Sequence, residues 1–145
     1  MRLLVQRVSS ARVEVAGECV GAIGSGLLVL AGFAAGDTLE KITFLADKCA
    51  HLRIFEDDSG KMNRSLLDIH GSALVVSQFT LYGDASHGRR PDFTAAARPE
   101  IAEPLYEALL EEFRKQGVET AGGRFGAEMR VSLVNEGPVT IMLEK

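Results

Sequence analysis

The run Leu27-Leu28-Val29-Leu30-Ala31-Gly32-Phe33 decides the fold, because it is apolar from end to end. A continuous apolar run of this length is typical of a strand that is buried on both faces. Gly24-Ser25-Gly26 separates the run from the segment before it. The sequence therefore predicts a fully buried strand early in the chain.

The residues before this strand predict a β-hairpin. Residues 3–8 and 12–15 are rich in β-forming side chains, and so are residues 19–23. Ala16-Gly17-Glu18 lies between the last two segments and has the composition of a turn. Further along, residues 53–56 predict a short strand that is closed by the turn Asp57-Asp58-Ser59-Gly60.

Two helices are predicted, each with one apolar face. Asp37 is expected to cap the first, with Glu40 completing a capping box. Its apolar positions recur at helical spacing: Ile42, Leu45, Ala46, Cys49 and Leu52. The second helix is expected to end at Gly117, and Pro104 places its regular start near Glu103. Its apolar positions are Ile101, Leu105, Leu109 and Phe113.

The remaining segments predict more strands. Residues 73–82 form a β-prone segment, and residues 129–134 and 139–143 read as two strands flanking Asn135-Glu136-Gly137-Pro138. The polar residues 83–98 make a loop long enough to suggest a function. We therefore expect an α/β fold of one domain, residues 1–145: a sheet-rich β/β/α layered arrangement, barrel-like, with the two helices on one face.

Composition limits the class of protein. The chain has 145 residues, 46% hydrophobic and 25% charged, which is the balance of a soluble globular protein. No run approaches the roughly 18 apolar residues of a membrane span, and no signal-peptide core precedes Arg7. Cys19 and Cys49 are far apart and suit a reducing compartment, so a cytoplasmic location is expected. The net charge of −4 argues against general coating of nucleic acid but allows a local basic surface.

The common catalytic motifs are absent from the sequence. His51, His70 and His87 have no metal-ligand spacing, and there is neither a G-x-S-x-G nor a phosphate-binding G-x-x-x-x-G-K motif. Cys49 and His51 are two apart on a helix and do not face each other, so we expect Cys49 in the core and His51 on the surface. Neither a metal nor a cofactor is expected.

Two short segments carry the candidate chemistry. Ser77-Gln78-Phe79-Thr80 ends an apolar strand, where Ser77 and Phe79 would face one way and Gln78 and Thr80 the other. These side chains could line a cleft, or could simply mark where the sheet meets solvent. Gly137-Pro138 would hold two carbonyls in fixed directions, or could be a plain hairpin turn.

Taken together, the segments resemble the two signature motifs of the D-aminoacyl-tRNA deacylase family. The motifs are Ser-Gln-Phe-Thr-Leu-Tyr-Gly-Asp, residues 77–84, and Asn-Glu-Gly-Pro-Val-Thr, residues 135–140. The resemblance continues in order through nearly the whole chain. It includes Gln6-Arg7-Val8, Gly26-Leu27-Leu28-Val29-Leu30, Leu52-Arg53-Ile54-Phe55-Glu56-Asp57, Lys61-Met62-Asn63, Gly88-Arg89-Arg90-Pro91 and Gly123-Arg124-Phe125-Gly126.

The resemblance implies a homodimer with each active site at the subunit interface. It makes Gly137-Pro138 a cis dipeptide that enters the partner's pocket and excludes the side chain of an L-amino acid. D-Aminoacyl-tRNA, bound by its 3′ end, would be the substrate. Glycyl-tRNA mischarged on tRNA-Ala would also be cleaved, because glycine has no side chain to exclude.

The same resemblance assigns catalysis to Ser77, Gln78, Phe79 and Thr80. The amide of Phe79 is the candidate for polarising the ester carbonyl. Thr80 is the obvious nucleophile by motif, but no base is evidently placed to activate it. The family chemistry instead uses the ribose 2′-OH of the RNA to assist water, and the protein mainly positions the reactants.

Substrate binding is assigned to Gly137, Pro138, Asn135, Thr140, Arg7 and Phe125. Arg7 shares a strand face with Leu3 and Val5, so it is expected to point inward and brace the Gly-Pro segment; pairing with an acid at a sheet edge is the alternative. Phe125 could stack on the terminal adenine or belong to the core. Arg89, Arg90 and Arg124 are candidate phosphate contacts.

Two other functions remain open at this point. A non-enzymatic nucleic-acid-binding protein of the same fold would bind tRNA without turnover. A small-molecule esterase would cleave simple aryl esters without RNA, although no feature of the sequence indicates a pocket for one.

Overall fold

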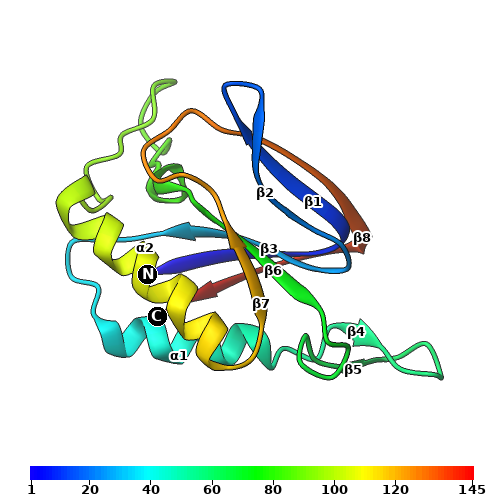
Figure 1. Cartoon of the computed structure of the whole chain (residues 1–145). Coiled ribbons are helices and arrows are strands. Elements are labelled where there is room, and N and C mark those ends of the chain that lie inside the picture. Colours follow the sequence, from blue (N-terminus) through cyan, green and yellow to red (C-terminus); the bar gives the residue numbers. More distant parts are fainter.

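The structure is a computed structural model that describes residues 1–145, and its centre is a strongly curved, mixed sheet (Figure 1). The strands of this sheet follow the order β2-β1-β3-β6-β7, and β8 pairs with β1 as well. Their bounds are β1 (Arg2–Val15), β2 (Glu18–Ile23), β3 (Gly26–Gly32), β6 (Ser72–Ser77), β7 (Glu119–Gly122) and β8 (Arg130–Glu144). The nearly closed sheet and the two helices described next confirm the predicted α/β, barrel-like fold class.

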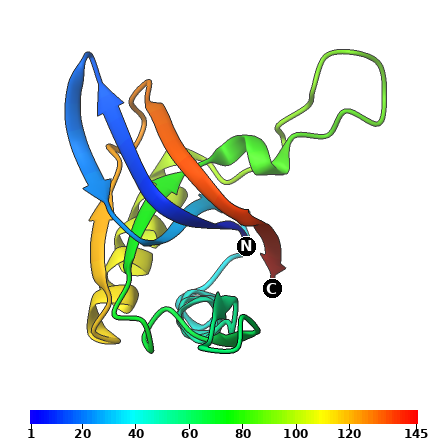
Figure 2. The same ribbon diagram turned by 90° about the vertical axis from the view of Figure 1, so that its right-hand side faces the viewer.

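Both helices pack on one face of the sheet, α1 (Leu39–Ala50) and α2 (Pro99–Lys115) (Figures 1 and 2). A short ladder, β4 (Phe55–Glu56) with β5 (Met62–Arg64), stands apart from the main sheet. The strand predicted over residues 53–56 is therefore limited to its last two residues. No helix is both long enough and apolar enough to cross a membrane.

Strand β3 is the buried strand that the sequence predicts. It lies between β1, to which it is antiparallel, and β6, to which it is parallel. Leu27 and Val29 belong to the large core under the helices, whereas Leu28 belongs to a smaller core enclosed by the curled sheet. Because successive side chains of a strand point to opposite faces, a strand between two cores must be apolar throughout.

The predicted hairpin is also present. β1 pairs antiparallel with β2, and Val15 stands opposite Glu18 across the turn. Both turn residues have positive φ, 50° at Ala16 and 83° at Gly17. Two left-handed residues give a two-residue turn whose twist matches that of the strands beside it.

The predicted capping box of α1 is wrong. Thr38 is the N-cap residue and makes no capping hydrogen bond through its side chain. The buried carboxylate of Asp37 instead accepts hydrogen bonds from the Ala34 amide, the Met1 ammonium and Lys41. Ala34 and Lys41 are three and four residues from Asp37, but the Met1 ammonium comes from a distant segment and spacing along the sequence does not reveal it.

The predicted start of α2 near Glu103 is also wrong, because the helix begins at Pro99 and runs through Pro104. Proline suits the first helical position, where its missing N–H would have no partner. Pro104 removes only the bond to the Glu100 carbonyl, and both residues lie on the exposed side. The buried face uses Ala102 where the sequence predicted Ile101, which is 42% exposed.

Two strand predictions near the signature motifs need correction. β6 ends at Ser77 and is followed by a 3-10 turn, η1 (Phe79–Tyr82), so the predicted alternation of Phe79 with Gln78 and Thr80 does not exist. Residues 129–134 and 139–143 are not two strands around a hairpin turn. Apart from Met129, which precedes it, they belong to the single strand β8 (Arg130–Glu144), whose two halves both pair with β1.

Candidate active site

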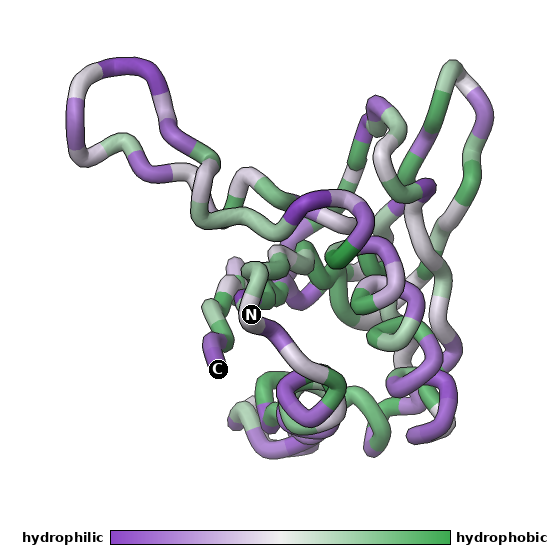
Figure 3. Tube along the Cα trace, turned by 90° about the vertical axis from the view of Figure 1, so that its left-hand side faces the viewer, coloured by the Kyte–Doolittle hydropathy of each residue, from purple (hydrophilic) through white to green (hydrophobic).

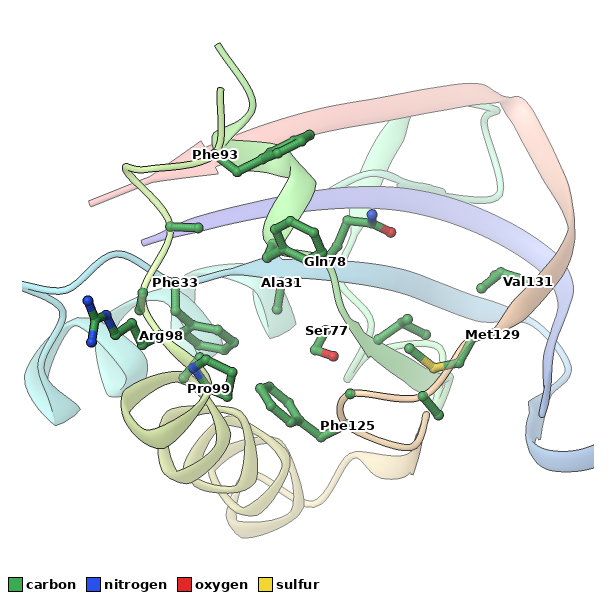
Figure 4. Close-up of a pocket in the computed structure, with 17 residues that line it drawn as sticks. Ala31, Phe33, Ser77, Gln78, Phe93, Arg98, Pro99, Phe125, Met129 and Val131 are labelled. Atoms are coloured by element: carbon green, nitrogen blue, oxygen red, sulfur yellow. The ribbon is translucent and has the colours of Figure 1, made fainter. Parts of the chain in front are cut away.

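A pocket of about 570 Å³ opens where β6 ends, beside the first residues of η1. Ser77, Phe33 and Phe125 converge on it from three different segments (Figure 4). Gln78 and Phe79 also line the pocket, so three of the four residues assigned to catalysis lie in one wall. Most of the other lining side chains are apolar, as is typical of pockets that bind small organic molecules.

The backbone of this wall presents two free donors. The Gln78 amide donates to the Ala31 carbonyl at 2.7 Å and extends the ladder beyond β6 by one residue. Within η1 the chain then turns, and the Leu81 amide donates to the Gln78 carbonyl at 3.2 Å. Phe79 and Thr80 are the first two residues of η1, whose N–H groups have no partner within the turn, and neither amide donates in the hydrogen bonds outside the regular elements. Two adjacent unpaired N–H groups are well suited to bind a carbonyl oxygen or an oxyanion.

Thr80 has no activating base in this structure. Its hydroxyl is exposed and accepts a hydrogen bond from the Gln78 side chain. No carboxylate or imidazole is hydrogen-bonded to it, although a nucleophilic hydroxyl needs such a partner. No cluster of three His, Cys, Asp or Glu side chains is close enough to hold a metal ion. As predicted, Cys49 is buried and His51 is exposed.

The Gly137-Pro138 segment forms a bulge in β8 instead of a turn between strands. Val8 pairs with Asn135 and Gln6 pairs with Thr140, so residues 136–139 stand opposite Arg7 alone. The Gly137-Pro138 peptide bond is cis, and both residues are exposed. Gly137 has φ +110°, a conformation that residues with a side chain rarely adopt.

Arg7 and Asn135 hold the bulge from below. The Arg7 side chain is buried and points inward, as predicted. Its guanidinium donates to the Ile54 carbonyl at 2.6 Å and to the Glu136 carbonyl at 3.3 Å, and lies 3.8 Å from the Glu56 carboxylate. The Asn135 amide donates to the carbonyls of Arg7 and Val139 at 2.9 and 3.0 Å. Thr140 completes the set through the Asn135 side-chain oxygen at 3.4 Å.

The pocket and the bulge lie far apart within one chain. Ser77 is level with Ala31 and hence with Leu3 of β1, whereas the bulge is opposite Arg7, four residues away. The other end of β8 reaches the pocket through Val131, but the bulge is several residues further along that strand. Standard strand dimensions give a separation of roughly 13 Å along the strands. The predicted site residues therefore form two groups that do not face each other.

Aromatic side chains build much of the pocket. Phe125 is half-buried and packs on Tyr106, with ring centroids 5.9 Å apart. The Tyr106 hydroxyl donates to the carbonyls of Val75 and Gly123, and burial raises the pKa of Tyr106 to about 12, so this donor stays protonated. Phe93 lies edge-on to Phe79 at 5.2 Å. Phe93 was not predicted from the sequence, although it closely follows the Gly-Arg-Arg-Pro motif.

Comparisons with known proteins find one family over nearly the whole chain. The family model described as D-Tyr-tRNA(Tyr) deacylase matches residues 4–144. The D-aminoacyl-tRNA deacylase of Roseiflexus castenholzii is 58% identical over 144 residues, which cover 99% of this chain and 92% of that one. The enzyme of the same name from Thermus aquaticus is 56% identical, over 99% of this chain and 95% of that one.

Two solved structures have the same fold. The "c-Myc DNA Unwinding Element Binding Protein" superposes with a TM-score of 0.93 and 43% identity, covering 100% of this chain and 99% of that one. A "probable eukaryotic D-amino acid tRNA deacylase" superposes with a TM-score of 0.86 over 98% and 97% of the two chains, and at 21% identity it supports the fold alone.

Fold, pocket and relatives define a hydrolase that acts on the ester bond of aminoacyl-tRNA. The chain belongs to the D-Tyr-tRNA(Tyr) deacylase family.

Proposed function

We propose that this protein hydrolyses the ester bond of D-aminoacyl-tRNA and releases the free D-amino acid and the tRNA. The observation that carries the proposal is the apolar pocket with the unpaired amides of Phe79 and Thr80 at its edge. An enzyme that corrects charged tRNA would act in the cytoplasm, where translation takes place.

In this proposal the Phe79 N–H binds the ester carbonyl oxygen and stabilises the charge that develops on it. The oxygen of a water molecule attacks the carbonyl carbon, and the bond to the ribose 3′ oxygen breaks. The neighbouring 2′-OH relays a proton from the water to the leaving oxygen. The terminal adenine occupies the pocket against Phe125. Thr80, which lacks a base, helps to position the substrate and does not act as the nucleophile.

A homodimer brings the two groups of site residues together. Because the bulge and the pocket are far apart in one chain, we propose that Gly137 and Pro138 of one subunit enter the pocket of its partner. Both residues are exposed and project from a bulge that Arg7 and Asn135 hold in place. Their carbonyls exclude an L side chain, whereas a D-amino acid or glycine is accepted.

The deciding experiment measures deacylation of D-tyrosyl-tRNA, with L-tyrosyl-tRNA as the control substrate. Phe79→Pro removes the amide donor, and Phe79→Ala removes the ring but keeps the donor. We expect kcat to fall about 10²- to 10³-fold in the proline variant and much less in the alanine variant. Equal losses in both variants would exclude the amide as the oxygen-binding group.

Chirality is tested separately with Pro138→Ala, which frees the backbone of the bulge. We expect this variant to cleave L-tyrosyl-tRNA faster relative to D-tyrosyl-tRNA. If the wild type cleaves both esters equally, or if the variant keeps full discrimination, the exclusion mechanism is wrong.

A second candidate is a nucleic-acid-binding protein without enzymatic activity. It is favoured by the name of the solved structure that is 43% identical, a DNA unwinding element binding protein. Tight binding of tRNA or DNA without turnover of any aminoacyl ester would support this candidate. Cleavage of simple aryl esters in the absence of RNA would instead indicate a small-molecule esterase.

A further inference from the structure

The arginines of this protein fall into two groups. Arg2, Arg12, Arg64 and Arg114 form ion pairs with carboxylates, and Arg7 and Arg53 donate to backbone carbonyls. The others make no ion pair and no side-chain hydrogen bond: Arg89, Arg90, Arg98, Arg124 and Arg130. Arg98 lines the pocket, Arg124 precedes the lining residue Phe125, and Arg89 and Arg90 belong to the loop that leads to the lining residue Phe93. Arg130 lies between Met129 and Val131, which also line the pocket, so at the start of a strand its side chain is expected on the opposite face.

Arg98 and Arg124 are at the pocket itself. Arg98 lines it and is the residue before α2. Arg124 is exposed and immediately precedes Phe125, whose ring contributes to the pocket wall. Unpaired guanidinium groups on segments that line an apolar pocket provide positive charge for an anionic group next to an aromatic ligand.

Arg89 and Arg90 are carried by a projecting loop, residues 84–92, which we call the arm. The arm extends away from the body of the molecule (Figures 2 and 3). Two backbone hydrogen bonds of 2.8 Å between Asp84 and Asp92 close its base. Phe93 follows directly, lines the pocket and packs on Phe79. The arm is therefore joined to the pocket wall through Phe93.

Charge is unevenly distributed along the arm. Its two acidic residues are at the base, where Asp84 accepts from the Ser86 amide and Asp92 from the Thr94 amide. The seven residues between them, 85–91, reach roughly 12 Å when folded back on themselves. Arg89 and Arg90 precede Asp92 by three and two residues, roughly 10 and 7 Å along an extended chain, and neither forms an ion pair with it, so both remain available as local positive charge although the chain has a net charge of −4.

We propose that Arg89, Arg90, Arg98 and Arg124 form a cationic rim that binds the phosphates of the RNA strand leading out of the pocket. The proposal rests on the proposed function, in which the terminal adenosine fills the pocket. Phosphates of the preceding nucleotides then pass the rim, and the arm reaches those farther along. Arginine binds phosphate in bidentate fashion, and these four arginines have no ion pair with a carboxylate that phosphate binding would have to break.

The test uses one substrate with phosphates and one without. The double variant Arg89→Ala/Arg90→Ala is compared with Lys61→Ala/Arg64→Ala, which removes the same charge from β5 and the residue before it. Lys61 has no ion pair, and Arg64 forms only an exposed one, so the control is expected to fold normally. The substrates are D-tyrosyl-tRNA and 3′-O-D-tyrosyl-adenosine.

We expect the arm variant to lower kcat/KM for the tRNA substrate about tenfold relative to the adenosine substrate, and the control variant to leave this ratio unchanged. The salt dependence is the second measurement. Because the arm variant no longer neutralises two single-strand phosphates, the slope of log kcat/KM against log salt becomes less negative by about 1.4. The Kd of uncharged tRNA, measured for the same variants, should change in parallel.

Three outcomes would overturn the proposal. In the first, the kcat/KM ratio of the two substrates and the salt slope stay at wild-type values in the arm variant. In the second, the control variant loses as much activity as the arm variant, which would mean that only net charge matters. Unchanged Kd for uncharged tRNA would also refute the rim. A wild type that cleaves neither substrate would refute the proposed function, and the Kd comparison would still decide whether the rim binds RNA.

Discussion

Arg7 and Gly137 depend on each other. The buried guanidinium of Arg7 has carbonyl partners on two segments, and one of them is Glu136 in the bulge. A buried charge without partners would strongly destabilise the fold. Arg7 can therefore be buried here only because these carbonyls accept its hydrogen bonds. Gly137 is the residue that lets the bulge approach this closely, because a Cβ there would lie 2.8 Å from the Arg7 guanidinium.

Substituting Gly137 with alanine should therefore destabilise the protein. The new side chain meets Arg7, and φ of +110° is unfavourable for alanine. We expect the free energy of unfolding to fall by about 1–3 kcal/mol in a urea titration. Gly24→Ala is the matched control, since nothing lies within 4 Å of its added Cβ. Equal stability of the two variants would contradict this explanation.

At the scale of the elements, local patterns predicted some features well and others badly. The apolar run of β3 and the Ala16-Gly17 turn depend on neighbouring residues, and both were predicted correctly. The environment of Asp37 depends in part on the Met1 ammonium, 36 residues away along the chain. The bulge of β8 depends on pairing with β1 across more than a hundred residues. Spacing along the sequence does not contain such long-range partners.

Pro104 offers a test of helix α2. Replacing it with alanine restores the hydrogen bond to the Glu100 carbonyl and removes the proline ring from the helix interior. We expect the free energy of unfolding to rise by about 1–3 kcal/mol, measured by chemical denaturation. Pro99→Ala, at the first helical position where proline is favourable, should give no such gain. A Pro104 variant no more stable than the wild type would contradict this expectation.

Asp37 should make the free energy of unfolding depend on pH in the acidic range. Burial raises the pKa of this carboxyl, but hydrogen bonds from the Ala34 amide, the Met1 ammonium and Lys41 together lower it below its usual value. A carboxyl with a lowered pKa in the folded state stabilises the protein above its unfolded pKa of about 3.9 and loses that contribution as pH falls.

We therefore expect Asp37→Asn to be less stable than the wild type at neutral pH, with the difference shrinking as the pH falls below about 4. Unfolding free energies measured across this range check the prediction. Asp58→Asn is the control, because its carboxylate is 94% exposed. A difference that stays constant with pH would show that the charge of Asp37 is not involved.

For the whole molecule, the sequence motifs identified the two groups of site residues, but not their separation within a chain. That separation follows from strand register, which puts Ser77 level with Leu3 of β1 and the bulge opposite Arg7, four residues away. The pocket lining from Phe33, Phe93 and Met129 also had no sequence signal of its own. These residues are scattered, and only the fold brings them together.

A shared active site can be tested by mixing two inactive variants. Phe79→Pro disables the pocket, and Pro138→Trp would block the pocket of the partner. If each site combines two subunits, a heterodimer of these variants contains one intact site. Random re-association should then restore about a quarter of wild-type activity on D-tyrosyl-tRNA. No recovery, with heterodimers present by native mass spectrometry, would place the site within one chain.

The unpaired amide of Phe79 has a consequence for mutational robustness. In the proposed reaction the essential donor is part of the main chain, and every residue type except proline carries it. Changing a phenylalanine codon into a proline codon requires more than a single base substitution. Random point mutation at this position can therefore alter the side chain, but one step cannot delete the donor itself.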